Sequence, residues 1–361
     1  MTQLANENGA RHQRGRLTWK YFWGWVVCAL VAELLAASLG LSYGSSSFGI
    51  ARIFDVLLGG DALTSSERMI LWFARFPRVC FAAVVGGALA SAGVVFQSLL
   101  RNPLADPYIL GVSGGGALCA TVYIALGGML WMGVWGLPAS AMAGALLTVV
   151  GLLLASRWIG GGKMGVYALL LLGVVFNAFA SAVITLFKAI MSAQKAQELL
   201  FYLMGSLSVE GTPLGVIAGV SVVVLGALGV MMYYANDLNV LALGDETAAS
   251  LGVEVERVRL VSVVAASIAV AVAVAYTGLI GFVGLIVPHG LRLIVGSDCR
   301  LLIPLSFLFG GVFLLLSDVV ARAGFEVFSM TLPVGVVTAL CGAPVFVWLL
   351  RRSFLTRRGI A

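Results

Sequence analysis

Two short strings of this sequence have the residue types that catalyse acyl transfer or bind phosphate in other proteins. The first, GVSGG at residues 111–115, matches the G-x-S-x-G pattern that places a nucleophilic serine at a sharp turn. That chemistry needs a histidine and an acid around the serine, on a soluble sheet. The chain has only His12, in a basic segment, and His289, in an apolar one. We therefore predict no catalytic residue and interpret the glycines as a thin helix surface for close packing.

The second string, GGGK at residues 160–163, resembles a phosphate-binding loop. That motif reads G-x-x-x-x-G-K followed by serine or threonine, so it needs a first glycine five residues before the glycine at 162 and a hydroxyl residue after the lysine. Those two positions hold Arg157 and Met164 here. The string therefore predicts no nucleotide site.

Residues that commonly bind metals are few and scattered. His289 has no second histidine, cysteine or carboxylate cluster nearby, and a lone histidine of this kind is more often structural than a ligand. The five cysteines lack C-x-x-C spacing and are interpreted as small apolar side chains: Cys28, Cys80, Cys119, Cys299 and Cys341. The sequence predicts neither a metal site nor a cofactor.

A polar turn separates two apolar segments at residues 101–116, which read RNPLADPYILGVSGGG. Pro103 and Pro107 lack an amide hydrogen and disfavour helical geometry in the residue before them. One helix is therefore predicted to end near Leu100, and the next to begin after Pro107. A polar turn of this kind needs water or protein around it rather than lipid.

The composition requires lipid as the solvent for most of the chain. Of the 361 residues, 61% are hydrophobic and 11% are charged, and the mean hydropathy is +1.05. A soluble domain carries about 25% charged residues. The 45 glycines agree with a membrane protein, because small residues let membrane helices approach closely.

Ten apolar segments are long enough to span a membrane or nearly so, since a span needs about 20 apolar residues. They cover residues 20–42, 76–100, 108–128, 137–157, 166–188, 213–235, 258–277, 280–296, 302–323 and 332–350. Gly281 and Gly284 make the eighth an irregular helix. Ten spans place both ends of the chain on one side of the membrane.

The basic residues indicate which side that is. With the N-terminus inside, 15 of the 22 Lys and Arg residues fall in inner segments and 7 in outer ones. The positive-inside rule then puts both termini in the cytoplasm. This asymmetry also accounts for the net charge of +6 without a nucleic-acid partner. We expect a basic cytoplasmic tail over 1–19, a transmembrane domain over 20–352 and a second cytoplasmic tail over 353–361.

Four strings within residues 65–352 carry a family resemblance. They read LLRNPLADPYILGVSGGGA, LNVLALGDETAASLGVEVERVR, GLIGFVGLIVPHGLRLIVGSDCRLLIP and LPVGVVTALCGAPVFVWLLRR. In their order and spacing they resemble the permease subunits of ABC importers for iron-siderophores, haem and cobalamin. The resemblance implies an all-α polytopic membrane protein of the type II ABC importer permease fold, with about ten transmembrane helices in two inverted five-helix halves. It also implies a place in the bacterial cytoplasmic (inner) membrane.

The same resemblance implies what the chain works with. A second copy would complete the pathway as a homodimer, and two separate ABC ATPase subunits would hydrolyse ATP at the cytoplasmic face. A periplasmic substrate-binding protein would deliver a metal chelate from outside. The chain itself would not be an enzyme. The expected pathway provides neither a cysteine nor a histidine to bind the metal directly. The chelate is therefore expected to pass with its metal still held.

The cytoplasmic loop predicted at residues 236–257 is the longest and most charged inner loop. Gly244 precedes a short helical run, DETAASL, and Gly252 stands where a C-cap glycine is expected. Asp245 and Glu246 lie at the N-terminus of that run, where the helix dipole favours negative charge. A helix in such a loop can be exposed to solvent and bind no partner. The resemblance implies instead that Gly244, Asp245, Glu246 and Gly252 couple the permease to its ATPase.

Two groups of residues are candidates for positions along the transport pathway. In the family, the positions of Asn102 and Leu104 narrow the cytoplasmic exit of the pathway. We therefore expect Asn102 to make polar contacts across the twofold axis and Leu104 to close the exit with an apolar side chain. The alternative is a turn with no role in closing the pathway. In the fifth span, Asn177, Ser181 and Thr185 stand among apolar neighbours. They fit a pathway wall and simple helix packing equally well.

Arginines on the outer face oppose the positive-inside bias. Arg75 and Arg78 flank the start of the second span, while Asp318, Arg322 and Glu326 share one helix face at i, i+4 and i+8. Interfacial snorkelling is one explanation. Docking to carboxylates is another, because arginine pairs with them bidentately. The matching family positions contact acidic residues of the binding protein, so the three arginines are predicted to dock it.

Two other functions compete with import driven by ATP. An ion-coupled secondary transporter should carry paired acids or a proton relay within its spans. Glu33 is the clearest acid inside a span, and the sequence shows no partner for it. A membrane-embedded enzyme would need a nucleophile or a metal constellation, which none of the strings above supplies. Which chelate is carried stays open among siderophore, haem and cobalamin.

Overall fold

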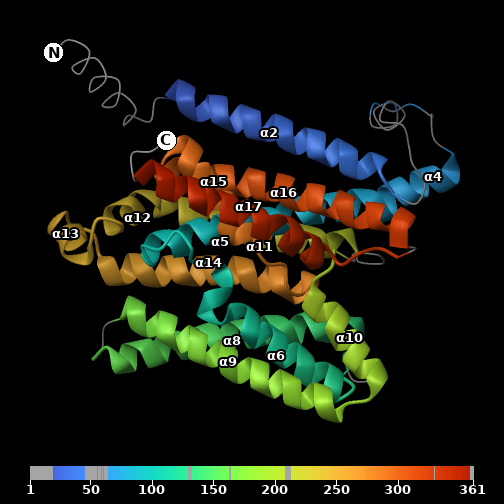
Figure 1. Ribbon diagram of the computed structural model, residues 1–361, viewed down its shortest axis with the longest axis horizontal. Coiled ribbons are helices and arrows are strands. Elements are labelled where there is room, and N and C mark those ends of the chain that lie inside the picture. The colour runs from blue at the N-terminus through green and yellow to red at the C-terminus, as the bar shows by residue number, and fades with distance from the viewer. Residues whose placement is uncertain are drawn as a thin grey trace.

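The computed structural model describes residues 19–44, 55, 58, 60, 64–128, 132–161, 164–207, 213–328 and 330–357, and the regular elements in these ranges are all helices (Figure 1). The long helices are α2 (Trp19–Ser42), α5 (Phe76–Leu99), α8 (Gly136–Ile159), α9 (Val166–Ile190), α11 (Leu214–Tyr233), α14 (Val255–Thr277), α16 (Cys299–Phe328) and α17 (Val334–Arg357). Shorter helices join them: α4 (Ser65–Ile70), η1 (Leu71–Arg75), η2 (Pro107–Leu110), α6 (Val112–Ala125), η3 (Gly133–Trp135), α10 (Ala193–Met204), α12 (Ala235–Leu241), α13 (Asp245–Ser250) and α15 (Val283–Val295).

Apolar helices occupy all ten of the segments expected from the sequence. Seven helices of the described ranges are long and apolar enough to cross a membrane, and three shorter ones complete the set, at Val112–Ala125, Val283–Val295 and Val334–Leu349. The all-α polytopic fold is thereby confirmed. Helix α17 runs on to Arg357, into the segment expected to be a cytoplasmic tail.

The second span begins earlier than expected, because α4, η1 and α5 form one continuous helix over Ser65–Leu99. A capping box starts it: the Thr64 amide donates to Glu67 Oε2 at 2.8 Å, and the Glu67 amide donates to Thr64 Oγ1 at 3.3 Å. Pro77 lies near the start of α5 and cannot donate to the preceding turn. The π-helical turn η1 immediately before α5 is the kind of local adjustment that lets a helix continue past such a residue.

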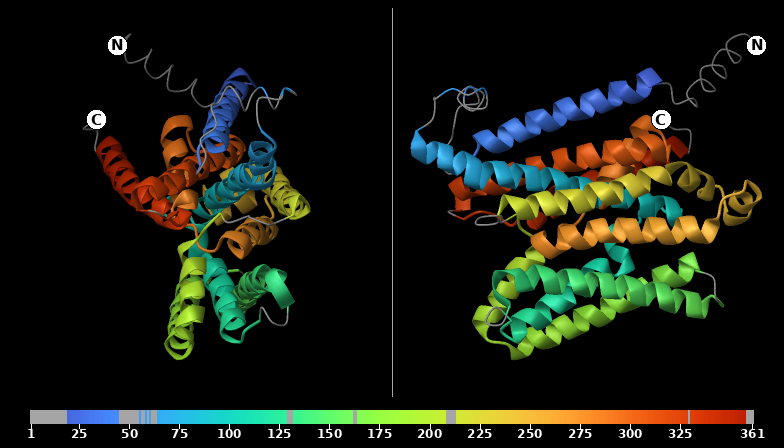
Figure 2. Two further views of the ribbon diagram at one scale, coloured as in Figure 1. Left: turned by 90° about the vertical axis from the view of Figure 1, so that its right-hand side faces the viewer. Right: turned by 180° about the vertical axis from the view of Figure 1, so that it is seen from behind.

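Helices α5 and α14 form the centre of the bundle and are buried along most of their length. Close backbone contacts hold α5 in place. A Cβ at Gly86 would lie 2.2 Å from the carbonyl oxygen of Gly310, and a Cβ at Gly93 would lie 1.9 Å from that of Gly284. Helix α14 packs on both α5 and α8, and so joins the group formed by α6, α8 and α9 to the rest of the bundle (Figure 2).

The two halves of the chain repeat one pattern. In each half the third apolar helix is short, 14 residues in α6 and 13 in α15. Each short helix follows a break and starts from a residue in the left-handed conformation, Gly111 with φ +74° and Phe282 with φ +70°. Paired helix breaks of this kind are typical of transporters built from inverted repeats.

The bundle has two distinct ends (Figure 1). The described start of α2, the end of α17 and helices α12 and α13 lie together at one end, which we call the α13 end. Helices α4 and α10 lie at the other, which we call the α4 end. The described parts of both termini are therefore on the side where the sequence predicts the cytoplasm.

Candidate functional site

The turn after α5 forms as the two prolines predict. Helix α5 ends at Leu99, and η2 begins at Pro107. Between them the side chain of Asn102 shapes the turn, since its Oδ1 accepts from the amide of Leu104 at 3.0 Å. The Asn102 carbonyl accepts from the amide of Ala105 at 3.1 Å. Asn102 and Leu104 are both exposed, and the neighbouring Arg101 donates to Leu241 and Asp245, so this turn lies at the α13 end. A role for the two residues in closing the pathway stays a prediction.

Helix α13 lies beside this turn and has the cap expected from the sequence. Gly252 has φ +86°, and its amide donates to the carbonyl of Ala249 at 3.0 Å. The next amide, of Val253, donates to the carbonyl of Ala248 at 3.0 Å. These two bonds form a Schellman motif, which favours glycine at the left-handed position. Gly244 at the other end of α13 has φ +130°, so glycines with positive φ bound this short helix on both sides.

Asp245, the first residue of α13, holds two arginines from other parts of the chain. Its Oδ2 accepts from Arg259 Nη2 of α14 at 2.7 Å, and its Oδ1 accepts from Arg101 Nη2 of the turn after α5. Burial raises the pKa of the Asp245 carboxyl. The hydrogen bond from Arg259 and the charges of both arginines outweigh that effect, so the pKa lies below its usual range. The carboxylate therefore stays ionised at neutral pH.

Arg259 is the fixed member of this group. It is 4% exposed, and its Nη1 donates to the carbonyl of Met164 at 2.9 Å. Glu256 lies 3.7 Å from the same Nη1 and accepts from the Met164 amide at 3.1 Å. Sequence reasoning missed Arg101 and Arg259 as partners of Asp245. Arg101 stands 144 positions from its partner, and no local pattern marks such a pair.

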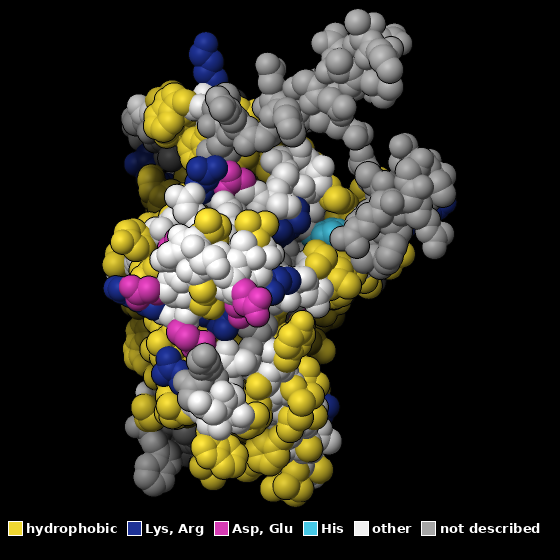
Figure 3. Space-filling model, turned by 90° about the vertical axis from the view of Figure 1, so that its left-hand side faces the viewer, with side chains coloured by type: hydrophobic (Ala, Val, Ile, Leu, Met, Phe, Trp, Pro, Cys, Tyr) yellow, Lys and Arg dark blue, Asp and Glu magenta, His cyan; other side chains and the backbone are white. Residues whose placement is uncertain are grey.

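The α13 end also presents apolar side chains next to its charges. Leu243 and Leu251 flank α13 and are 69% and 64% exposed. Figure 3 looks onto this end, where acidic and basic side chains gather among hydrophobic ones. An exposed apolar pair beside charged groups is the composition of a protein–protein contact. The two leucines were not singled out from the sequence, because an isolated leucine in a membrane protein carries no signal.

The three predicted docking arginines come together near the α4 end, but they bind partners within the chain. Arg78 binds Asp318 through Nε at 3.0 Å and Nη2 at 2.8 Å, and Arg322 Nε lies 3.0 Å from the same carboxylate. Arg322 Nη1 also donates to the carbonyl of Gly40 at 2.9 Å. Arg75 is 5% exposed, and its Nη1 donates to the carbonyl of Leu41 at 2.7 Å.

These contacts give the three arginines a structural role. Arg75 and Arg322 satisfy carbonyl groups at the C-terminal end of α2, which have no partner within their own helix. Arg78 of α5 and Arg322 share the buried carboxylate of Asp318 on α16, so the cluster joins α2 to both helices. A binding protein would therefore compete with Asp318 and with these carbonyls for the guanidinium groups. Docking by the three arginines stays a prediction.

The three polar residues predicted in the fifth span lie on one face of α9. The side-chain Nδ2 of Asn177 donates to the backbone carbonyl of Tyr108 at 3.0 Å, so Asn177 stabilises the helix break before α6. Ser181 and Thr185 are exposed, and Thr185 Oγ1 donates to the Ser181 carbonyl at 2.8 Å. A role in lining the pathway stays a prediction for all three.

The two helix breaks touch each other through one side chain. The hydroxyl of Tyr108, before α6, donates to the carbonyl of Ile280 at 2.8 Å and accepts from the Ile280 amide at 3.0 Å. Ile280 belongs to the break before α15. Non-helical backbone inside a membrane protein must have its polar groups satisfied by protein. Tyr108 does this for one residue of the opposite half, and it was not predicted from the sequence.

Metal-ligating groups are sparse in the described ranges. No three His, Cys, Asp or Glu side chains of the described residues come close enough to hold a metal ion. The described cysteines are all free thiols. His289 is 4% exposed and packs beside the ring of Phe346, with ring centroids 6.2 Å apart.

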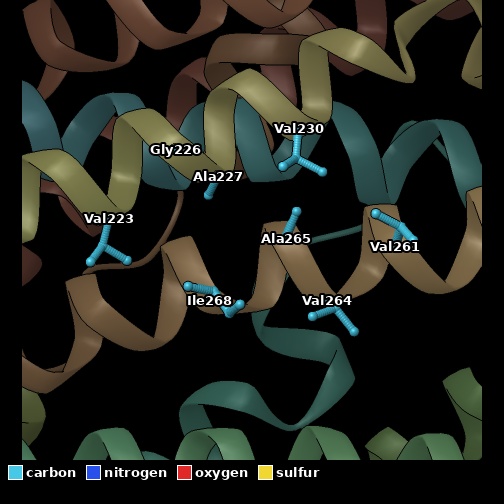
Figure 4. A pocket seen from close by; sticks show the side chains of 8 residues that line it. All are labelled: Val223, Gly226, Ala227, Val230, Val261, Val264, Ala265 and Ile268. Carbon is cyan, nitrogen blue, oxygen red and sulfur yellow. The ribbon is translucent and has the colours of Figure 1, made fainter.

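An apolar groove of about 340 Å³ runs between α11 and α14 (Figure 4). Only valine, glycine, alanine and isoleucine line it: Val223, Gly226, Ala227, Val230, Val261, Val264, Ala265 and Ile268. It provides no polar group to orient a chelate. The charged cluster of Asp245, Arg101 and Arg259 and the exposed Leu243 and Leu251 make the α13 end the candidate functional site.

Relatives of known name are similar in sequence to most of this chain. The chain is 41% identical to the cobalamin import system permease of Halobacterium salinarum over 287 residues, 79% of this chain and 74% of that one. It is 35% identical to the hemin transport system permease of Yersinia pestis over 332 residues, 91% of this chain and 97% of that one.

A solved structure agrees with this similarity. It is described as a metal-chelate type ABC transporter in an inward-facing conformation, and it superposes with a TM-score of 0.78 at 28% identity, over 91% of this chain and 98% of that one. The sequence model of the FecCD transport family matches residues 30–352. These findings confirm the resemblance noted in the sequence. Because the match covers most of the chain, the protein belongs to the FecCD transport family.

Proposed function

We propose that this protein is the permease subunit of an ATP-driven ABC importer that carries a metal chelate into the bacterial cytoplasm. Two copies form the pathway, two separate ATPase subunits bind the α13 end, and a substrate-binding protein delivers the chelate at the α4 end. The distribution of basic residues supports a cytoplasmic α13 end. The chelate belongs to the class of cobalamin, haem and ferric siderophores, as the names of the relatives suggest.

One observation carries this proposal most directly. A short capped helix with exposed apolar and acidic side chains lies beside the turn that holds Asn102 and Leu104, at the same end of the bundle. An ATPase that binds α13 would therefore bind next to the proposed exit. The secondary-transporter alternative rests on Glu33, whose carboxyl faces α16: a Cβ at Gly311 would lie 2.7 Å from its Oε1.

Changes to α13 are expected to uncouple ATP hydrolysis from transport without preventing membrane insertion. Asp245→Lys should break the pairs that hold α13 to Arg101 and Arg259, and Glu246→Lys should disturb the contact with the ATPase. Gly252→Val should distort the cap, because a β-branched residue strongly disfavours φ +86°. Uptake and ATP hydrolysis are measured in vesicles reconstituted with the ATPase subunits.

The control for the cap is Gly229→Val in α11. A new Cβ meets nothing within 4 Å at either glycine, and Gly252 alone of the two has a positive φ, so the comparison isolates the backbone requirement from a clash at Cβ. If all three α13 variants transported as the parent does, the coupling role of α13 would be wrong.

The docking prediction can be separated from the structural role of the arginines. Alanine at Arg75, Arg78 or Arg322 should weaken binding of the substrate-binding protein, by about 0.2–1 kcal/mol for a pair at the rim of an interface. The effect should be larger at low salt, where screening is weaker. Binding is measured on immobilised transporter across a salt series. The unfolding temperature of each variant shows whether α2 is still packed. Unchanged affinity and salt dependence in variants that stay folded would leave the arginines a structural role alone.

A further inference from the structure

Arg101 connects the proposed exit to α13, and its backbone is in a conformation that side chains disfavour. It lies between Leu100, the C-cap of α5, and Asn102. Its φ of +48° is in the left-handed region, where residues with a Cβ are uncommon. Such a conformation persists only where surrounding contacts determine it, and it is found at switch regions more often than elsewhere.

Several contacts fix Arg101 in this conformation. Its amide donates to the carbonyl of Ser98 at 3.3 Å, and the next amide, of Asn102, donates to that of Gln97 at 3.1 Å. Its side chain extends toward α12 and α13. There Nε donates to the carbonyl of Leu241 at 3.2 Å, and Nη2 donates to Asp245 Oδ1. One residue therefore ties the turn after α5 to the two short helices of the α13 end.

The two ion pairs of Asp245 differ in how firmly they are held. The side chain of Arg259 is 5% exposed and also donates to the carbonyl of Met164, so the Arg259–Asp245 pair is held firmly on α14. The side chains of Arg101 and Asp245 are 44% and 49% exposed. Ion pairs at that exposure contribute little to stability and can exchange with water. A displacement of α13 would therefore break the Arg101–Asp245 pair first.

We propose that Arg101 is a positioning residue for the exit, and that the Arg101–Asp245 pair transmits the movement of α13 to the turn holding Asn102 and Leu104. The two backbone bonds to Ser98 and Gln97 form the Schellman motif that ends α5, and they set the positive φ of Arg101. While the pair is intact, the Arg101 side chain ties this turn to α13 and the turn has the shape seen here. When the ATPase displaces α13, the pair breaks and the turn relaxes. This inference rests on the proposed function for the source of the displacement, but the contact itself can be tested without ATP.

Substitutions at Arg101 can remove the side-chain contact and spare the backbone. Asparagine adopts the left-handed conformation more readily than most residues, so Arg101→Asn keeps the turn and deletes the link to α13. Asp245→Asn weakens the same contact from the other side. Arg101→Lys keeps the charge but loses the planar fork, and should restore part of the function. Arg257→Asn is the matched control, since Arg257 is an exposed arginine of α14 that pairs with the exposed Glu254 rather than with Asp245.

The first readout is the reactivity of a cysteine at position 104, with the native cysteines replaced and no ATPase present. Arg101→Asn and Asp245→Asn should each raise the rate of maleimide labelling of Leu104→Cys several-fold. The double variant should react no faster than the faster single variant, because both changes remove the same Arg101–Asp245 contact. Arg257→Asn should label at the parental rate. Unchanged rates in the single variants, or effects that multiply in the double variant, would overturn the proposal.

The second readout is the amount of chelate taken up for each ATP hydrolysed by the assembled transporter. Arg101→Asn should lower this ratio at least tenfold while the ATPase subunits still bind, and Arg101→Lys should recover part of it. A parental ratio in Arg101→Asn would show that the link does not transmit movement. If the parent itself showed no uptake that depends on ATP, the proposed function would fail, while the labelling rates would still decide whether Arg101 holds the exit.

Discussion

Asp318→Asn is expected to lower the free energy of unfolding by roughly 3–5 kcal/mol, the usual cost of removing one partner from a buried ion pair. Asp318 is 1% exposed and lies 2.8 Å from Arg78 and 3.0 Å from Arg322. Asparagine would leave two guanidinium groups without their shared counter-charge between α2, α5 and α16. Because Arg322 also donates to the carbonyl of Gly40 at the end of α2, the first helix should detach early.

The measurement is denaturant unfolding of the purified protein in detergent, followed by tryptophan fluorescence. Glu254→Gln is the control, because the side chains of Glu254 and Arg257 are 72% and 66% exposed and lie 3.6 Å apart. Removing that pair should change the free energy by at most about 1 kcal/mol. Equal unfolding midpoints for the two variants would mean that the Asp318 cluster does not hold α2.

Cysteines placed at Asn102 or Leu104 are expected to cross-link two copies of the chain in the closed state and to abolish uptake. Both positions are exposed in the single chain, in the turn that Arg101 links to α13, as a contact across a twofold axis requires. Cross-linking is followed by gel electrophoresis in each nucleotide state, after the native cysteines have been replaced. Uptake should return when the cross-link is reduced.

The control for this experiment is Val222→Cys, on α11 and 70% exposed, which lies outside the proposed exit. It should not block uptake under the same oxidising conditions. A failure of positions 102 and 104 to cross-link in every nucleotide state would show that these residues do not close the pathway between two copies.

Much of the fold follows from short-range signals in the sequence. Apolar segment length locates the ten helices, because a span must satisfy its own backbone groups in lipid. Pro103 and Pro107 locate the break between α5 and α6, and Gly252 locates the end of α13. Each of these signals acts within one turn of helix or one loop. The second span was predicted to begin at residue 76, whereas the π-helical turn η1 lets one helix run from Ser65 past Pro77 to Leu99.

The parts that were missed depend on contacts between distant segments. The sequence correctly grouped Arg75, Arg78 and Arg322, but it could not show that their side chains turn toward α2 and Asp318. The same limit applies to Tyr108, whose hydroxyl binds the opposite half of the chain. Long polar side chains reach several ångströms from their backbone, and helix packing decides which neighbour they meet.

The central claim is that this chain is the permease of an ATP-driven chelate importer. The most direct test reconstitutes it in vesicles with the ATPase and binding-protein subunits of its importer. Uptake is measured for three probes, cyanocobalamin, haemin and radioactive iron bound to a hydroxamate siderophore, with and without ATP at the α13 face. The account predicts uptake of one of the three that requires both ATP and the binding protein. Uptake that proceeds without ATP and instead follows a proton or sodium gradient would contradict it.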